Sequence, residues 1–175
     1  MPPVTLVLGG ARSGKSRFAE DLAAASGLAR TYVATAEVWD DEMRERIAHH
    51  RARRDGAWTT VDAPLDLPEA LPAASGRDRI VLIDCLTLWL SNVMLADRDV
   101  EAAIDALLAA LAAISGPAIL VSNEVGSGIV PDTRLGRDFR DHQGRLNQRV
   151  AAVADRVTLV VAGLPLDLKL PKEPS

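Results

Sequence analysis

Residues 4–16 have the sequence VTLVLGGARSGKS, a short apolar run followed by a glycine-rich segment that ends in lysine and serine. Residues 9–16 match the pattern G-x-x-x-x-G-K-[ST] at every position. The apolar run is typical of a buried strand, and residues 18–25 have helical spacing up to Gly27, a favourable C-cap. We therefore predict a strand, a phosphate-binding loop (P-loop) and a helix in that order.

Each position of this loop has a physical role. The glycines let successive N–H groups curl around a β-phosphate, and the following helix adds the positive end of its dipole. Lys15 would place its ammonium between the β- and γ-phosphates, and Ser16 would offer a hydroxyl to Mg²⁺. A second Mg²⁺ anchor is expected at the end of a buried strand, where Asp84 ends the run RIVLID. Alternatively, Asp84 caps the helix that starts near Leu86.

The rest of the chain repeats the alternation of strand and helix. We expect strands at 31–35, 79–84, 118–122 and 157–162, and helices at 40–54, 86–95, 100–114 and 133–154. Residues 63–76, rich in Pro and small side chains, are expected to connect elements, and the proline-containing tail 164–175 to be a surface appendage. Continuous apolar strands between helices predict an α/β fold with a mostly parallel sheet and helices on both faces, in a single domain spanning 1–175.

Composition limits the class of protein. The chain has 175 residues, 48% hydrophobic and 25% charged, which argues against disorder. Apolar runs are shorter than the roughly 20 residues of a membrane helix, and the N-terminus lacks the pattern of a signal peptide, so we expect a cytoplasmic protein with no membrane segment. The net charge of −4 and an aromatic content of 3% argue against a nucleic-acid partner. The single cysteine, Cys85, excludes an internal disulfide and is expected to be buried.

Residues 40–54 form a charged helix in this interpretation, acidic at its start and basic at its end. This distribution could stabilise the helix dipole alone, or its basic end could bind phosphate. The segment holds two histidines, which can be neutral nucleophiles near neutral pH. His50 follows the apolar stripe of Met43 and Ile47, whereas His49 lies well round the helix. Of the two, His50 is better placed to reach a nucleotide on the protein body.

Several motifs together resemble one family. They are GGARSGKS, VAT at 33–35, DDEM…RIAHHR, the acidic strand end at Asp84, and SNEVGSGIVP with the later GRLNQR. In combination they resemble the bifunctional adenosylcobinamide kinase and adenosylcobinamide-phosphate guanylyltransferase family of cobalamin biosynthesis. The resemblance runs from Val4 to about Gly163.

The resemblance implies two reactions. ATP or GTP phosphorylates the hydroxyl of adenosylcobinamide, and GMP is then transferred from GTP to that phosphate, giving adenosylcobinamide-GDP and pyrophosphate. In the family the second step passes through a GMP-histidine, and the matching residue here is His50, with Lys15 as the other catalytic residue. The resemblance also implies a RecA-like P-loop NTPase fold and a homotrimer.

The family's nucleotide contacts carry over to individual positions. Glu is common in the family where this chain has Asp84, which is paired with Ser16 as the expected Mg²⁺ ligands. The expected nucleotide-binding residues are Gly9, Gly10, Ala11, Arg12, Ser13, Gly14, Lys15, Ser16, Val33, Ala34, Thr35, Arg51, Ala52, Arg53, Arg54, Asp62 and Asp84.

Two other classes of function fit the P-loop alone. One is a metabolite kinase with a different acceptor, and the other is a nucleotide-binding regulatory module without turnover. Only the bifunctional enzyme should become covalently labelled by α-labelled GTP.

Overall fold

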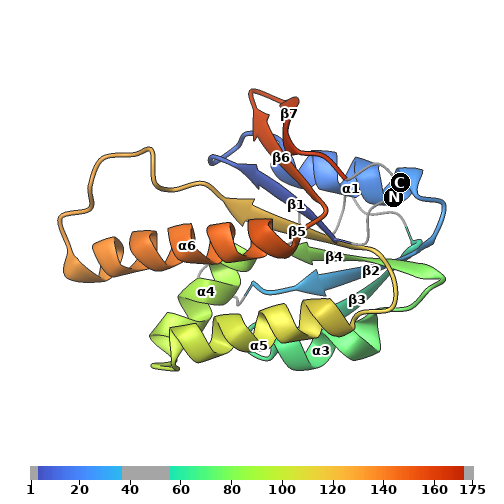
Figure 1. Cartoon of the computed structure of the whole chain (residues 1–175), viewed down its shortest axis with the longest axis horizontal. Coiled ribbons are helices and arrows are strands. Elements are labelled where there is room, and N and C mark those ends of the chain that lie inside the picture. The colour runs from blue at the N-terminus through green and yellow to red at the C-terminus, as the bar shows by residue number, and fades with distance from the viewer. Residues whose placement is uncertain (1–3, 37–55, 172–175) are drawn as a thin grey trace.

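The computed structural model describes residues 4–36 and 56–171. A twisted sheet runs through the middle of the molecule, with helices packed against it (Figure 1). In chain order the elements are β1 (Val4–Gly9), α1 (Lys15–Ala25), β2 (Ala29–Ala34), β3 (Trp58–Asp62), α3 (Leu67–Ala74), β4 (Arg79–Asp84), α4 (Leu86–Leu95), α5 (Val100–Ala113), β5 (Ala118–Asn123), α6 (Arg134–Val153), β6 (Arg156–Val161) and β7 (Leu164–Lys169).

The seven strands in the described part of the chain lie in the order β3-β2-β4-β5-β1-β6-β7. Every pairing among β1 to β6 is parallel, and β7 alone pairs antiparallel, with β6. The carboxyl ends of the parallel strands therefore meet at one edge of the sheet, where ligands of open α/β sheets bind. The P-loop follows β1 at this edge.

Two hydrophobic clusters cover the two faces of the sheet. Alternate residues such as Val7 and Val121 pack with Ala19 and Ala23 of α1. Their neighbours, among them Leu6, pack on the other face with α3, α4, α5 and α6. Of the described helices, Figure 1 shows only α1 on its side of the sheet. Because both faces are buried, the strands have the continuous apolar runs that the sequence shows.

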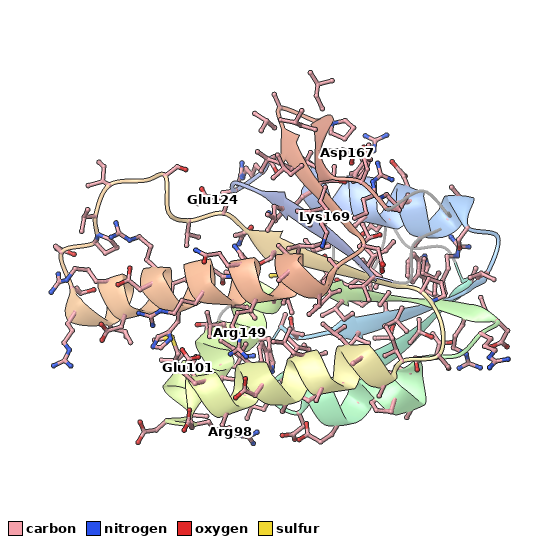
Figure 2. The ribbon with its side chains drawn as sticks, viewed as in Figure 1. Arg98, Glu101, Glu124, Arg149, Asp167 and Lys169 are labelled. Atoms are coloured by element: carbon pink, nitrogen blue, oxygen red, sulfur yellow. The ribbon has the colours of Figure 1, made fainter. Side chains whose placement is uncertain are left out.

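Ion pairs join the outer helices of the larger layer. Arg149 of α6 lies 3.4 Å from the Glu101 carboxylate of α5 and also contacts Asp105, and Figure 2 shows Arg149 and Glu101 on facing sides of the two helices. These side chains are partly exposed, so the pairs contribute little to stability compared with the apolar contacts beneath them.

The α/β fold with a mostly parallel sheet is confirmed, and most expected elements lie within a few residues of their predicted positions. The strand at Arg79–Asp84 and the helix at Leu86–Leu95 have the predicted bounds. Thr133 caps α6, its hydroxyl accepting from the Gly136 N–H at 3.1 Å. The expected helix at 40–54 lies outside the described residues.

Three elements were not expected, namely α3, β3 and β7. The segment 63–76 is not only a connection, because it contains α3, whose Leu67, Leu71 and Ala74 are buried along one stripe. Its prolines obscured the helical spacing, although Pro68 lies in the first turn, where proline is tolerated. Strand β3 was missed because it is a short edge strand with exposed Thr59 and Thr60 in place of an apolar run.

The tail 164–175 is also not simply a surface appendage. Its first part is the edge strand β7, whose Asp167 carboxylate accepts hydrogen bonds from Arg156 and Thr158 of β6. The prolines of this tail do not prevent a strand, because an edge strand tolerates proline where no ladder bond is needed. No helix in the ranges 4–36 and 56–171 combines the length and apolarity required to cross a bilayer.

Candidate nucleotide site

The P-loop connects β1 to α1 in a tight, left-handed path. Arg12 has φ 55° and Gly14 has φ 95°, and the Ser13 N–H donates to the Gly10 carbonyl at 3.3 Å. Helix α1 begins at Lys15, so the N–H groups of its first turn point toward the P-loop end of the helix. The loop thus has the backbone shape that wraps a phosphate, as predicted for this motif.

Crowding explains two of its glycines. A Cβ on Gly9 would collide with the side chain of Ser13, and one on Gly14 would lie 3.3 Å from the Cα of Gly163. The Gly163 N–H, in the turn between β6 and β7, donates to the Ser13 carbonyl at 2.9 Å. The P-loop is therefore supported from outside by the final hairpin of the sheet.

Lys15 and Ser16 place their polar groups at this loop. The Lys15 ammonium donates to the Gly10 carbonyl at 3.1 Å, and the Ser16 hydroxyl donates to the Asp84 carboxylate at 3.5 Å. Ser16 and Asp84 are 68 residues apart in the chain. The fold thus brings together the two residues that the sequence analysis paired.

Asp84 has a second donor that the sequence analysis missed. The Tyr32 hydroxyl donates to the other carboxylate oxygen of Asp84 at 3.2 Å. Tyr32 is in β2, which pairs with β4, and its ring is buried on the α1 face of the sheet. The sequence signal was weak, since a tyrosine in an apolar strand is usually a packing residue. Here its hydroxyl fixes the direction of the carboxylate.

Thr35 joins the ends of β2 and β4. Its hydroxyl donates to the Cys85 carbonyl and accepts from the Cys85 N–H, both at 2.8 Å. Val33 is fully buried in the larger core cluster, so its side chain does not line the site, and Ala34 is partly buried. The VAT segment therefore holds Asp84 and Cys85 in place at the strand ends.

Cys85 is buried, as expected, beside this carboxylate. Burial raises the pKa of its thiol to about 11, and the negative charge of Asp84 raises it in the same direction. The thiol is therefore neutral at physiological pH and is no nucleophile there.

Asp62 ends β3 and is exposed. Three strands separate it from β1, which at a strand spacing of about 4.8 Å puts it ~19 Å along the edge from the P-loop. It cannot contact the phosphates that the P-loop holds. A nucleotide touching both would have to extend along the carboxyl edge of the sheet.

The other expected site residues, His50 and Arg51, Ala52, Arg53 and Arg54, lie outside the described residues. In the chain they come between the carboxyl end of β2 and the start of β3, so the segment that holds them starts from the same sheet edge as the P-loop. Among the described residues no group of three His, Cys, Asp or Glu side chains could hold a metal ion.

A family model covers almost the whole chain. The model for cobinamide kinase / cobinamide phosphate guanyltransferase matches residues 5–168. The chain belongs to this family. The match continues into β7, past the point near Gly163 where the resemblance was expected to end. The cobinamide kinase / cobinamide phosphate guanyltransferase family combines two transfer activities, so the chain is an enzyme of cobalamin biosynthesis.

Individual relatives agree with this assignment. The bifunctional adenosylcobalamin biosynthesis protein CobP of Pseudomonas aeruginosa is 51% identical over 166 residues, covering 94% of this chain and 96% of that protein. The bifunctional adenosylcobalamin biosynthesis protein CobU of Escherichia coli is 42% identical over 179 residues, covering 94% and 98%.

Solved structures with little sequence similarity share the fold. The flagellar accessory protein FlaH of Methanocaldococcus jannaschii has a TM-score of 0.55 at 14% identity, over 98% of this chain and 80% of FlaH. An ATPase of a bacterial type III secretion system has a TM-score of 0.52 at 12% identity, over 94% of this chain and 56% of that one. These likenesses show a P-loop NTPase fold.

Proposed function

We propose that this enzyme phosphorylates adenosylcobinamide with ATP or GTP and then transfers GMP from GTP to adenosylcobinamide phosphate. The observation that carries the proposal is the meeting of Ser16 and Asp84 at 3.5 Å beside a complete P-loop. A hydroxyl and a carboxylate in this position are what a P-loop needs to bind a nucleotide with its metal. Membership of the family supports cobinamide as the phosphoryl acceptor and guanylyl transfer as the second reaction.

The P-loop supports the kinase step through charge and position. Its N–H groups and the N-terminus of α1 neutralise the β-phosphate, and Lys15 exchanges the Gly10 carbonyl for the β- and γ-phosphates. Little covalent chemistry is asked of the protein in phosphoryl transfer, because positioning and charge stabilisation account for most of the catalysis. The other expected nucleotide contacts, from Val33 to Asp62, remain part of the proposal.

The donor set fits Mg²⁺. This cation prefers oxygen ligands and usually keeps several waters, with one or two protein oxygens and the substrate phosphates completing its shell. Ser16 and Asp84 would hold it, and the Tyr32 hydroxyl would orient Asp84. When bound, Mg²⁺ neutralises charge on the β- and γ-phosphates.

His50 is proposed as the nucleophile of the second reaction. A ring nitrogen attacks the α-phosphorus of GTP, an N–P bond forms, and the bond to the pyrophosphate oxygen breaks. A phosphate oxygen of adenosylcobinamide phosphate then attacks the same phosphorus, breaks the N–P bond and gives adenosylcobinamide-GDP. Arg51, Arg53 and Arg54, next to His50 in the chain, would balance the charge on pyrophosphate.

The remaining parts of the proposal concern the whole protein. We propose a single nucleotide-binding domain that works in the cytoplasm without a nucleic-acid partner and assembles as a homotrimer. Exposed leucines along one face of the edge strand β7 are consistent with assembly, since such a face favours burial against another chain. They are Leu164, Leu166 and Leu168.

The deciding experiment is incubation with GTP labelled at the α-phosphate, followed by denaturation and gel separation. Label should remain on the protein, and it should be released by acid but not by alkali, as a phosphoramidate requires. The label should leave the protein when adenosylcobinamide phosphate is added before denaturation. Protein that binds GTP but retains no label would contradict the covalent route.

A further inference from the structure

We propose that Asn123 contacts the terminal phosphate of the nucleotide held by the P-loop. The proposal rests on the nucleotide site proposed above and adds a residue to it. Asn123 is the last residue of β5, and β5 lies between β1 and β4 in the sheet. It therefore ends between the strand that leads into the P-loop and the strand that ends at Asp84.

The alternation along β5 sets the direction of the Asn123 side chain. Ile119 and Val121 belong to the cluster on the α1 face, whereas the Ser122 hydroxyl donates to Asn147 of α6 on the opposite face. By the two-residue period of a strand, Asn123 points to the α1 face. Its register partner on β1 is Gly9, whose own Cβ direction leads to Ser13 of the P-loop. Asn123 thus shares a face with the P-loop.

The side-chain amide of Asn123 has a buried oxygen that makes no hydrogen bond among the described residues. Within 4–36 and 56–171, the buried Oδ1 atom of Asn123 has no hydrogen-bond partner, and neither has the buried hydroxyl of Ser13. Buried polar atoms without partners are rare and costly in native proteins. Two of them beside one phosphate-binding loop indicate a polar ligand. The Ser13 hydroxyl can donate to a phosphate oxygen, whereas Oδ1 of Asn123 needs a ligand group that donates, and the amide nitrogen next to it is the atom that can donate to the phosphate. An amide suits a phosphoryl-transfer site, because it carries a donor for a phosphate oxygen and an acceptor for the attacking hydroxyl.

The backbone of Asn123 is held on both sides. Its N–H donates to the Thr87 hydroxyl of α4 at 2.8 Å, and its carbonyl accepts from the Asn147 amide of α6 at 3.0 Å. Asn147 is held in turn by Ser122 and the fully buried Gln143. Four polar side chains thus fix the residue, while its own amide oxygen stays unused. This arrangement favours a ligand contact positioned in advance, which costs little reorganisation when the ligand binds.

The terminal phosphate is the part of the nucleotide that this position fits. The P-loop would surround the β-phosphate, and a metal held by Ser16 and Asp84 would supply positive charge to the phosphates next to it. Asn123, at the end of β5, lies between the end of β1, which leads into the P-loop, and the end of β4, where Asp84 lies. Its amide should therefore distinguish a nucleoside triphosphate from a diphosphate.

Calorimetric titration tests this with two probes, the imido analogue of GTP and GDP, each with Mg²⁺. For Asn123→Ala we expect the affinity for the imido triphosphate to fall about tenfold and the affinity for GDP to change less than twofold. Asn123→Asp, nearly the same in shape, should weaken triphosphate binding further, because it places a negative charge beside the γ-phosphate. Gln148→Ala, which removes an exposed amide from α6, is the matched control and should change neither affinity.

The outcomes separate this inference from the proposed function. Equal losses for both probes, or no loss, in Asn123→Ala and Asn123→Asp would overturn the role of Asn123 while leaving the nucleotide site intact. Absence of nucleotide binding by the wild-type chain would overturn both. Thermal unfolding of each variant without nucleotide checks its fold, and if Asn123→Ala does not fold, the near-isosteric Asn123→Asp carries the comparison.

Discussion

Lys15 can exchange its bond to the Gly10 carbonyl, at 3.1 Å, for a phosphate. We expect Lys15→Ala to lower kinase activity at least a hundredfold, because the variant loses the P-loop cation that would lie between the β- and γ-phosphates. The measurement is the rate of adenosylcobinamide phosphate formation. Lys169→Ala is the matched control. The Lys169 ammonium donates to the carbonyls of Ala151 and Ala152, so the variant should keep wild-type kinase activity. Wild-type turnover by Lys15→Ala would refute the role of the loop.

The two histidines should separate the two half-reactions. Phosphoryl transfer to a hydroxyl needs position and charge, whereas a covalent route needs a nucleophile. His50→Asn should therefore lose guanylylation and keep measurable kinase activity, and His49→Asn should be milder in its effect on guanylylation. Protein-bound GMP and cobinamide phosphate are measured for both variants. Label kept in His50→Asn and lost in His49→Asn would reverse the assignment.

Cys85 should be unreactive in the native protein. With its thiol pKa raised to about 11 by burial and by Asp84, the thiolate is scarce at pH 8, and the sulfur is enclosed as well. We expect no labelling by a thiol reagent over an hour at pH 8 and one equivalent after unfolding in urea. Rapid labelling of the folded chain would show that this part of the site opens.

At the scale of one element, the β6–β7 hairpin depends on Asp167. Hydrogen bonds from Arg156 and Thr158 lower the pKa of this carboxyl below its ordinary value of 3.8. The folded state thus prefers the charged form, so the stabilisation is complete above pH 3.8 and is lost as the pH falls through the lower, folded-state pKa. We expect Asp167→Asn to reduce the free energy of unfolding by about 1 kcal/mol at pH 7.

Urea unfolding at several pH values checks this prediction. The difference between wild type and Asp167→Asn should shrink in acid, where the wild-type carboxyl becomes protonated. Asp21→Asn is a suitable control, because Asp21 is exposed and its ion pair with Arg17, at 3.9 Å, should contribute only a few tenths of a kcal/mol. A difference that stays constant down to pH 2 would contradict the assigned pKa direction.

Elements with strong local signals could be predicted from the sequence. Strand Arg79–Asp84 is a continuous apolar run and helix Leu86–Leu95 follows it directly, so both have the predicted bounds. Strands β3 and β7 lack such signals because they are edge strands, one half polar and one containing proline. Their formation depends on pairing with a neighbour in the sheet, which the linear pattern does not contain.

In the site, too, residues within one contiguous motif could be predicted, whereas residues brought together by the fold could not. The P-loop is contiguous, and so its residues and the need for an acidic partner could be predicted from one motif. Tyr32 and Asn123 could not, because their positions follow from the strand order β2-β4-β5-β1 and from the face each side chain takes. The predicted meeting of Ser16 and Asp84 is observed, and their role as metal ligands stays a prediction.

At the scale of the whole molecule, α1 and β4 contribute one oxygen group each to the proposed metal site. We expect excess EDTA to abolish both transfers and added Mg²⁺ to restore them, since two protein groups without a metal cannot neutralise a triphosphate. Steady-state assays of phosphorylation and of guanylylation provide the readout. Activity that persists in chelator would contradict the metal site.

The hydrogen bond from Gly163 to Ser13 has a consequence for folding during synthesis on the ribosome. Ser13 is made early, but its supporting N–H arrives 150 residues later, together with β6, which must pair beside β1. At a synthesis rate of about 5–20 residues per second, roughly 8–30 s pass between the synthesis of Ser13 and that of Gly163. We therefore expect nascent chains that have not yet reached Gly163 to gain no stability from cellular nucleotides, so that ligand binding protects only chains synthesised beyond that residue.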